Sequence, residues 1–273
     1  MVNYNGTLIS HSDPLFKAGN RAFLYGDQLF ETLLYKNSTL KFWEDHYFRM
    51  MGGACLLRME IPVHLNMDFM YQEIRNTLQA SHLDNQDARV RLSLFRVDGG
   101  LYTPVNRSLE YLIEVEAIVP FDSSKGLVID VFHDHLKPSL PLYNIKGANS
   151  LVSVLSAIFA KDNKLDEAII LNSESYLCET TASNIFVVKD NIIYTPSISS
   201  GCVDGIIRKQ LFENASEWGL NIVEKDMKSF ELIKADEVFL TNSIKGIQWV
   251  KSYKKKNYTN SFSQAIRLKL IDL

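Results

Sequence analysis

Apolar positions in the first half of the chain follow two periods, one of two residues and one close to four. Segment 29–35 is predicted as a strand, and the polar residues 36–38 form a turn into a second apolar segment, 39–42, so a hairpin is expected. Helical spacing begins directly afterwards, where Trp43, Tyr47 and Met50 share one face. The same criteria predict further strands at 7–10, 88–95 and 109–117 and helices at 43–57 and 66–80.

The second half consists of shorter apolar runs separated by turn residues. Residues 189–191 are expected to join two of these runs as a hairpin, and Gly219 is expected to end a helix. The pattern predicts strands at 127–132, 167–171, 185–188, 192–195, 221–224 and 237–241 and helices at 150–161, 208–218 and 229–235.

The stretch 119–126 has the composition of a linker, with Pro120, two serines and Gly126. We therefore expect a mixed α/β chain with an N-terminal domain at 1–118 and a C-terminal domain at 127–273. A second flexible segment, 96–108, contains Gly99, Gly100 and Pro104 and has the length of loops that cover binding sites.

Composition narrows the classes of function. A net charge of -3 and a pI near 6.1 give no basic surface for nucleic acid or an anionic membrane, and no apolar run is long enough to span a bilayer. The three cysteines form no CxxC pair, and His133 and His135 have no third ligand at metal spacing, so no metal site is predicted. A reduced, cytoplasmic location is expected.

Candidate chemistry centres on Lys146. Gly147 and Ala148 leave room for a ligand to approach closely, and the neighbouring apolar residues would remove water from the amine, which favours an imine-forming nucleophile and base. An ordinary surface lysine is the competing interpretation.

Other residues are candidates for binding a ligand that reacts with Lys146. Glu179, which has no basic neighbour in sequence, is either a solvated turn residue or a carboxylate that binds a protonated ring nitrogen. Residues 205–207 precede a predicted helix, so their amides can face an anion, and Ser243 follows a strand where it can add a hydroxyl. Arg49 either clamps a phosphate or caps a surface.

Taken in order, these residues resemble the class IV, or fold type IV, pyridoxal phosphate enzymes. This family contains branched-chain and D-amino acid aminotransferases and 4-amino-4-deoxychorismate lyase. The resemblance covers most of the chain and depends on five motifs in the expected order and spacing. These motifs are Tyr25-Gly26-Asp27, His46-Tyr47-Phe48-Arg49, Lys146, Glu179 to Asn184 and Gly205 to Arg208, and the match ends near Gly246.

The resemblance implies a small N-terminal α/β domain, a larger C-terminal α/β pseudo-barrel domain and a homodimer in which the partner lends a loop to the site. It also implies that Lys146 forms the Schiff base with pyridoxal 5'-phosphate and moves protons, while Glu179 binds the pyridine nitrogen. The implied phosphate ligands are Arg49, the amides of Ile206 and Ile207, and Ser243 with the amide of Ile244.

The motifs point to two activities within the family. Asn149, three residues after Lys146, is typical of the D-amino acid enzymes and the lyase, and residues 99–104 resemble a loop of the lyase. The loop lacks the arginine and histidine with which D-amino acid enzymes grip the substrate carboxylate. Phe23 stands where lyases carry a threonine, and Gln28 replaces the glycine that usually follows Gly-Asp.

We therefore expect an aminotransferase that moves an amino group between an amino acid and a 2-keto acid. The first alternative is the lyase, which releases 4-aminobenzoate and pyruvate from aminodeoxychorismate. The second is a non-enzymatic anion-binding module on the same fold. Arg91 is the candidate for a substrate carboxylate, with an outward-facing strand arginine as the competing interpretation, and Phe23, Tyr25 and Leu34 are expected to shape the substrate pocket.

Overall fold

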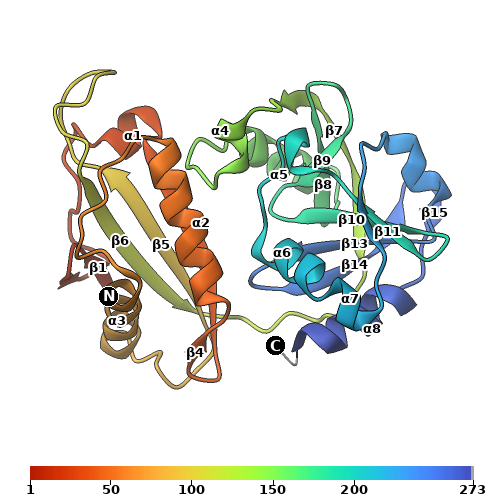
Figure 1. Ribbon diagram of the computed structural model, residues 1–273, viewed down its shortest axis with the longest axis horizontal. Helices are drawn as coiled ribbons and strands as arrows, with labels where there is room; N and C mark the ends of the chain where they lie inside the picture. Colours follow the sequence, from red (N-terminus) through yellow and green to blue (C-terminus); the bar gives the residue numbers. More distant parts are fainter. Residues whose placement is uncertain (272–273) are drawn as a thin grey trace. The chain divides into compact units, whose positions relative to one another are not determined.

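The computed structural model describes residues 1–271, and the chain divides into two compact units (Figure 1). Unit 1 comprises Met1–Pro120 together with Ile145–Asn149, and unit 2 comprises Phe121–Asn144 and Ser150 onward. The return of Ile145–Asn149 to unit 1 differs from the sequence analysis, which assigned these residues to the C-terminal domain. The reason is backbone pairing, because Phe30 N donates to Lys146 O at 2.9 Å and Ala148 N donates to Gln28 O at 2.9 Å.

Unit 1 is built on an antiparallel sheet whose strand order, within residues 1–271, is β2-β1-β6-β5-β3-β4. Helices α2 and α3 cover one face of this sheet (Figure 1). The elements of unit 1 are β1 (Val2–Tyr4), β2 (Thr7–Ile9), α1 (Arg21–Tyr25), β3 (Gln28–Lys36), β4 (Thr39–Leu40), α2 (Trp43–Leu56), α3 (Met67–Ala80), β5 (Ala88–Arg96) and β6 (Leu109–Ala117).

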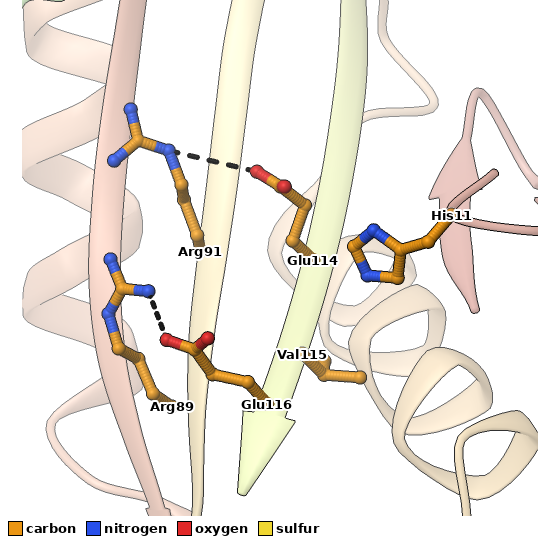
Figure 2. Close-up of a pocket in the computed structure, with 6 residues that line it drawn as sticks. All are labelled: His11, Arg89, Arg91, Glu114, Val115 and Glu116. Carbon is orange, nitrogen blue, oxygen red and sulfur yellow. Dashed lines mark hydrogen bonds and ion pairs between the residues drawn. The ribbon is translucent and has the colours of Figure 1, made fainter. Parts of the chain in front are cut away.

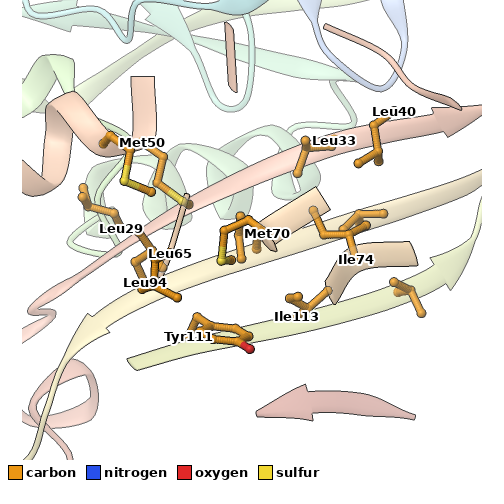
Figure 3. Close-up of a cluster of buried hydrophobic side chains, with 14 of the residues drawn as sticks. Leu29, Leu33, Leu40, Met50, Leu65, Met70, Ile74, Leu94, Tyr111 and Ile113 are labelled. Atoms are coloured by element: carbon orange, nitrogen blue, oxygen red, sulfur yellow. The ribbon is translucent and has the colours of Figure 1, made fainter. Parts of the chain in front are cut away.

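The core of unit 1 forms because strand and helix periods place apolar side chains on facing surfaces. Leu29 and Leu33 of β3 alternate with less buried residues, and they meet Met50 of α2 and Ile74 of α3 (Figure 3). Asn66 begins α3 by accepting a hydrogen bond from Phe69 N at 2.9 Å. The alternation leaves Phe30 and Leu34 on the face of β3 that points away from this core.

Unit 2 contains a mixed sheet whose strand order, among the described residues, is β12-β11-β10-β13-β14-β7-β8-β9, with β15 paired to β14. Its strands are β7 (Leu127–Lys137), β8 (Glu167–Asn172), β9 (Leu177–Thr180), β10 (Asn184–Lys189), β11 (Ile192–Thr195), β12 (Ile222–Glu224), β13 (Glu237–Asn242), β14 (Gly246–Tyr253) and β15 (Lys256–Asn257). Its helices are α4 (Pro141–Asn144), α5 (Leu151–Asp162), η1 (Ile198–Ser200), α6 (Ile206–Glu213), α7 (Ala215–Trp218), η2 (Ser229–Lys234) and α8 (Ser261–Ile271).

Three predicted elements of unit 2 differ from the structure. Strand β7 extends to Lys137, because the chain rejoins the sheet opposite Asn172 after an irregular, exposed segment at 133–136. The predicted helix 208–218 is two helices, since Asn214 ends α6 and its side chain donates to Gln210 O. The predicted helix 229–235 is a 3-10 helix, η2.

The strands β1, β9, β14 and β15, the 3-10 helix η1 and the helices α1, α4 and α8 were not predicted. Among the described residues, no helix has the length and apolar character needed to cross a membrane.

Candidate active site

Lys146 lies beside an aromatic ring on unit 1. Its backbone is held against β3 by the two hydrogen bonds that return Ile145–Asn149 to this unit, and Gly147 forms a bridge with Leu29. The half-buried side chain places Nζ 4.4 Å from the centroid of the Phe30 ring. The sequence folds this way because β3 alternates, so that Leu29 enters the core while Phe30 remains on the opposite face.

Arg91 of β5 lies against the same ring. Its Cζ is 3.9 Å from the Phe30 centroid, and its Nε is 3.8 Å from Glu114 Oε2. Figure 2 shows Arg91 and Glu114 in a hollow that is also lined by His11, Arg89, Val115 and Glu116. Burial lowers the pKa of Arg91, with a further decrease from Arg89 and a partly opposing effect of Glu114. The structure therefore gathers an amine and a guanidinium around Phe30.

Arg49 of α2 is fixed by a buried carboxylate. Its Nε donates to Glu31 Oε1 at 2.8 Å and its second donor reaches Glu31 Oε2 at 2.5 Å, while His46 Nδ1 lies 2.6 Å from the same Oε2. Burial of Glu31 acts to raise its pKa, but Arg49 and His46 together outweigh burial and lower the pKa to about 2. His46 and Arg49, which belong to one motif of the family resemblance, therefore both contact Glu31.

The other pocket residues predicted on unit 1 are more exposed. Phe23 of α1 is largely exposed, and the Tyr25 ring lies 5.6 Å from the Tyr102 ring and 5.0 Å from the Arg21 guanidinium. Leu34 is half-buried and shares a face of β3 with Phe30.

Glu179 lies within β9 of unit 2 and is almost fully buried. Its Oε1 accepts a hydrogen bond from Lys137 Nζ at 2.6 Å, and its Oε2 accepts one from Val203 N at 2.9 Å. The solvated-turn interpretation of Glu179 is therefore wrong, because the residue sits in a strand and is held by a cation and a backbone amide.

The start of α6 lies next to the ends of two strands. Gly205 is the N-cap residue, and no side chain of residues 1–271 caps the helix there, so the amides of Ile206 and Ile207 face outward from the first turn. A Cβ on Gly205 would meet Asn184 Oδ1 at 2.0 Å, which explains why glycine is needed. Asn184 itself donates to Val203 O at 2.8 Å and pairs with Thr241 across β10 and β13.

Hydroxyl groups lie at the end of β13, the strand that pairs with Asn184 beside the start of α6. Thr241 Oγ1 is buried and has no hydrogen-bond partner within residues 1–271. Ser243 follows two residues later, and the amide of Ile244 already donates to Asn242 Oδ1 at 3.1 Å. A buried hydroxyl without a partner is costly unless a ligand satisfies it, so this cluster has the composition of an anion site.

Four residues of these clusters were not singled out from sequence. Phe30 and Glu31 lie in the predicted strand 29–35. Glu31 could have been found from the pattern, because it occupies a core-facing position between Leu29 and Leu33, where a charged residue is unusual. Thr241 was expected only as the last residue of the predicted strand 237–241. Lys137 gave no signal, because it is 42 residues from Glu179 in the chain and meets it only across β8.

Comparison with known proteins places these residues in context. The family described as "Amino-transferase class IV" matches residues 28–253. A putative branched-chain-amino-acid aminotransferase of Methanocaldococcus jannaschii is 28% identical over 250 residues, which cover 89% of this chain and 84% of that protein. An aminodeoxychorismate lyase of Vibrio harveyi is 27% identical over 236 residues and covers 84% of both chains.

Solved structures agree with these sequence matches. A putative 4-amino-4-deoxychorismate lyase from Legionella pneumophila superposes with a TM-score of 0.83 at 26% identity, covering 96% of each chain. A branched-chain amino acid aminotransferase from Thermobaculum terrenum, solved in its PLP form, gives a TM-score of 0.85 at 22% identity over 99% of this chain and 92% of that chain. The predicted two-domain fold type IV architecture is confirmed by these matches.

Proposed function

Because this chain belongs to the class IV aminotransferase family, we propose that it moves an amino group between an amino acid and a 2-keto acid, with Lys146 as the reactive amine. The observation that carries the proposal is the Phe30 ring, which holds Lys146 Nζ at 4.4 Å and Arg91 at 3.9 Å. An amine beside a carboxylate-binding group is what an amino acid substrate requires.

The residues of both units fit pyridoxal phosphate. When bound, the cofactor supplies an aldehyde that condenses with amines and a ring that accepts electrons released at the substrate α-carbon. Glu179 would bind the ring nitrogen, and the amides of Ile206 and Ile207 with Ser243 would hold the phosphate. The buried Thr241 hydroxyl supports an anion site there, because it lacks a partner among the described residues.

Lys146 would act twice in this chemistry. Its Nζ would hold the cofactor before substrate arrives, and once released it would take the proton from the α-carbon of the amino acid and hold it for return. The Phe30 ring, whose centroid is 4.4 Å from Nζ, covers one side of the amine. Arg49, fixed by Glu31, would add a guanidinium ligand to the phosphate.

Arg91 would bind a carboxylate of the substrate. Its guanidinium is oriented by the Phe30 ring and only loosely paired with Glu114, so further donors can face a substrate oxygen. Phe23, Tyr25 and Leu34 would then shape the pocket around the side chain of the substrate.

Aminodeoxychorismate lyase is the second candidate function. It is favoured by the 27% identity to the Vibrio harveyi enzyme and by the loop residues 99–104, and it is opposed by Phe23, which has no hydroxyl to assist elimination.

The experiment has two stages. Purified protein loaded with pyridoxal phosphate is reduced with borohydride, and peptide mass spectrometry is expected to find the cofactor on Lys146; its absence from that peptide would refute the role of Lys146. The holoenzyme is then incubated with amino acid and keto acid pairs, and separately with aminodeoxychorismate. Amino transfer is expected in the first incubation, whereas 4-aminobenzoate and pyruvate in the second alone would establish the lyase.

The resemblance to the family also supports a homodimer, and we propose that the enzyme acts in the cytoplasm. The free state of Cys55, Cys178 and Cys202 supports a reducing compartment.

A further inference from the structure

Lys137 and Glu179 form a buried ion pair, and the proposed function assigns a role to Glu179 but none to Lys137. The two residues are 9% and 7% exposed, and Lys137 Nζ lies 2.6 Å from Glu179 Oε1. Lys137 is the last residue of β7 and pairs with Asn172 of β8, while Glu179 of β9 pairs with Ile170 of β8. The lysine therefore reaches across one strand to the carboxylate from a rigid position in the sheet.

The pair leaves room for a third group. A carboxylate has about four acceptor positions, and contacts from Lys137 and Val203 N each occupy one. The neighbouring thiols of Cys178 and Cys202 are neutral, because burial foremost and then Glu179 raise the pKa of each. These thiols therefore add no negative charge beside Glu179, and its contact with a charged group is the one with Lys137 Nζ.

We infer that Lys137 is a positioning residue, whose ammonium holds Glu179 in place and faces its negative charge, so that a proton between Glu179 and the cofactor ring nitrogen stays on the nitrogen. This inference rests on the proposed role of Glu179. Coulomb attraction falls with distance, so the ammonium of Lys137 stabilises the adjacent carboxylate anion more than it destabilises a protonated nitrogen on the far side of that carboxylate. A protonated ring is the better electron acceptor, and Lys137 thereby supports proton removal at Lys146 without touching the substrate.

The test replaces Lys137 in the holoenzyme and measures the ring nitrogen directly. Wild type, Lys137→Met, Lys137→Gln and Lys137→Arg are reconstituted with pyridoxal phosphate labelled at the ring nitrogen, and nitrogen NMR reports its protonation. We expect a protonated nitrogen in wild type and Lys137→Arg and a shift toward the unprotonated form in Lys137→Met and Lys137→Gln. Their kcat should fall about 10- to 100-fold, the range found when a group that supports a ligand is removed, with little change in KM.

Lys225→Met is the matched control, because Lys225 pairs with Glu231 at the same 2.6 Å but is exposed. It should leave the nitrogen signal and kcat unchanged. Lys137→Gln keeps a neutral donor in place, so it decides the question if Lys137→Met does not fold. A protonated nitrogen and normal kcat in folded Lys137→Gln would overturn the inference, whereas failure of wild type to bind the cofactor would refute the proposed function instead.

Discussion

Glu31 shows how one buried carboxylate organises its neighbours. It accepts hydrogen bonds from Arg49 and contacts His46 at 2.6 Å, all between β3 and α2. Arg49 and His46 compensate the charge of this carboxylate, which allows a glutamate to occupy a core-facing position. Removing one member of the group would leave a buried charge without compensation. The position of Arg49 depends on Glu31 and not on the helix alone.

The pH dependence of stability should report this carboxylate. The pKa of Glu31 is lowered from 4.5 to about 2 in the folded protein, so its contribution is fully present above pH 4.5 and is lost as the pH falls toward 2. We expect the difference in unfolding free energy between wild type and Glu31→Gln to shrink by about 3 kcal/mol across that interval. Urea denaturation of both proteins at several pH values between 2 and 4.5 measures this difference in unfolding free energy.

Glu60→Gln is the control, because Glu60 forms an exposed pair with Arg107 at 2.7 Å. Its difference from wild type should vary little with pH. A pH-independent difference for Glu31→Gln would show that the pKa of Glu31 is not lowered in the folded protein.

Arg91 and Arg89 offer a matched pair on one face of β5. Arg91→Gln is expected to lower kcat/KM about 10- to 100-fold, mainly through KM, because a charge-assisted hydrogen bond to the substrate carboxylate is lost. Arg89→Gln should have little effect, since Arg89 pairs with the exposed Glu116 at 2.5 Å. Steady-state kinetics of both variants test whether Arg91 binds the substrate carboxylate. An equal decrease of kcat/KM in the two variants would contradict a specific contact by Arg91.

The sequence identified candidate residues but not the residues that contact them. The candidates Lys146 and Glu179 followed from motifs in order, which depend only on chain position. Lys137 could not be found that way, because its contact with Glu179 depends on β8 lying between the two strands that carry them.

At the scale of elements, long periodic segments were predicted closely. Helices α2 and α3 and strands β3, β5 and β6 lie within two residues of their predicted ends, because each buries one continuous apolar face. Elements without a simple pattern were missed: α1 buries only Arg21, and α8 follows a polar turn at the end of the chain. The split between α6 and α7 depends on the side chain of Asn214, which periodicity does not register.

The start of α6 makes a prediction about one glycine. Gly205→Ala would drive Asn184 from its hydrogen bond with Val203 O, because the new Cβ would lie 2.0 Å from Asn184 Oδ1. The displaced amides of Ile206 and Ile207 should weaken cofactor binding about 10-fold, equal to the loss of about one hydrogen bond. Titration with pyridoxal phosphate, followed by absorbance, gives the dissociation constant.

Gly52→Ala is the opposite case within α2, where a Cβ would meet nothing within 4 Å. It should raise the unfolding free energy by about 1 kcal/mol through helix propensity and leave cofactor binding unchanged. Weaker binding in both variants would mean that the effect of Gly205→Ala is not local to α6.

At the scale of the whole molecule, the proposed roles are divided between the two units. Unit 1 carries Lys146, Arg91 and Arg49, and unit 2 carries Glu179 and the remaining candidate phosphate ligands. Lys146 belongs to unit 1 only because a five-residue return segment pairs with β3, although most of its sequence neighbours belong to unit 2. Local periodicity cannot predict that this segment belongs to unit 1, because its place depends on backbone pairing with β3, a strand more than a hundred residues earlier in the chain.

Loop 97–108 carries the prediction about assembly. Leu101, Tyr102 and Val105 are 77%, 90% and 81% exposed, while Arg21 holds the loop by donating to the carbonyls of Gly99 and Leu101. An apolar surface that is fixed and exposed is typical of a contact between subunits. Wild type is therefore expected to be a homodimer in light scattering. Tyr102→Asp is expected to raise the dissociation constant of the dimer about 10-fold or more, because an aromatic side chain that the dimer contact would bury is replaced by a charge.

Val63→Asp is the control for this loop, because Val63 is a single apolar residue, 95% exposed, whose replacement should leave the dimer intact. If the partner completes the site, as the family resemblance implies, activity of Tyr102→Asp should fall at low protein concentration and recover at high concentration. A concentration-independent loss would instead indicate that Tyr102 acts within its own subunit, where its ring already contacts Tyr25 at 5.6 Å.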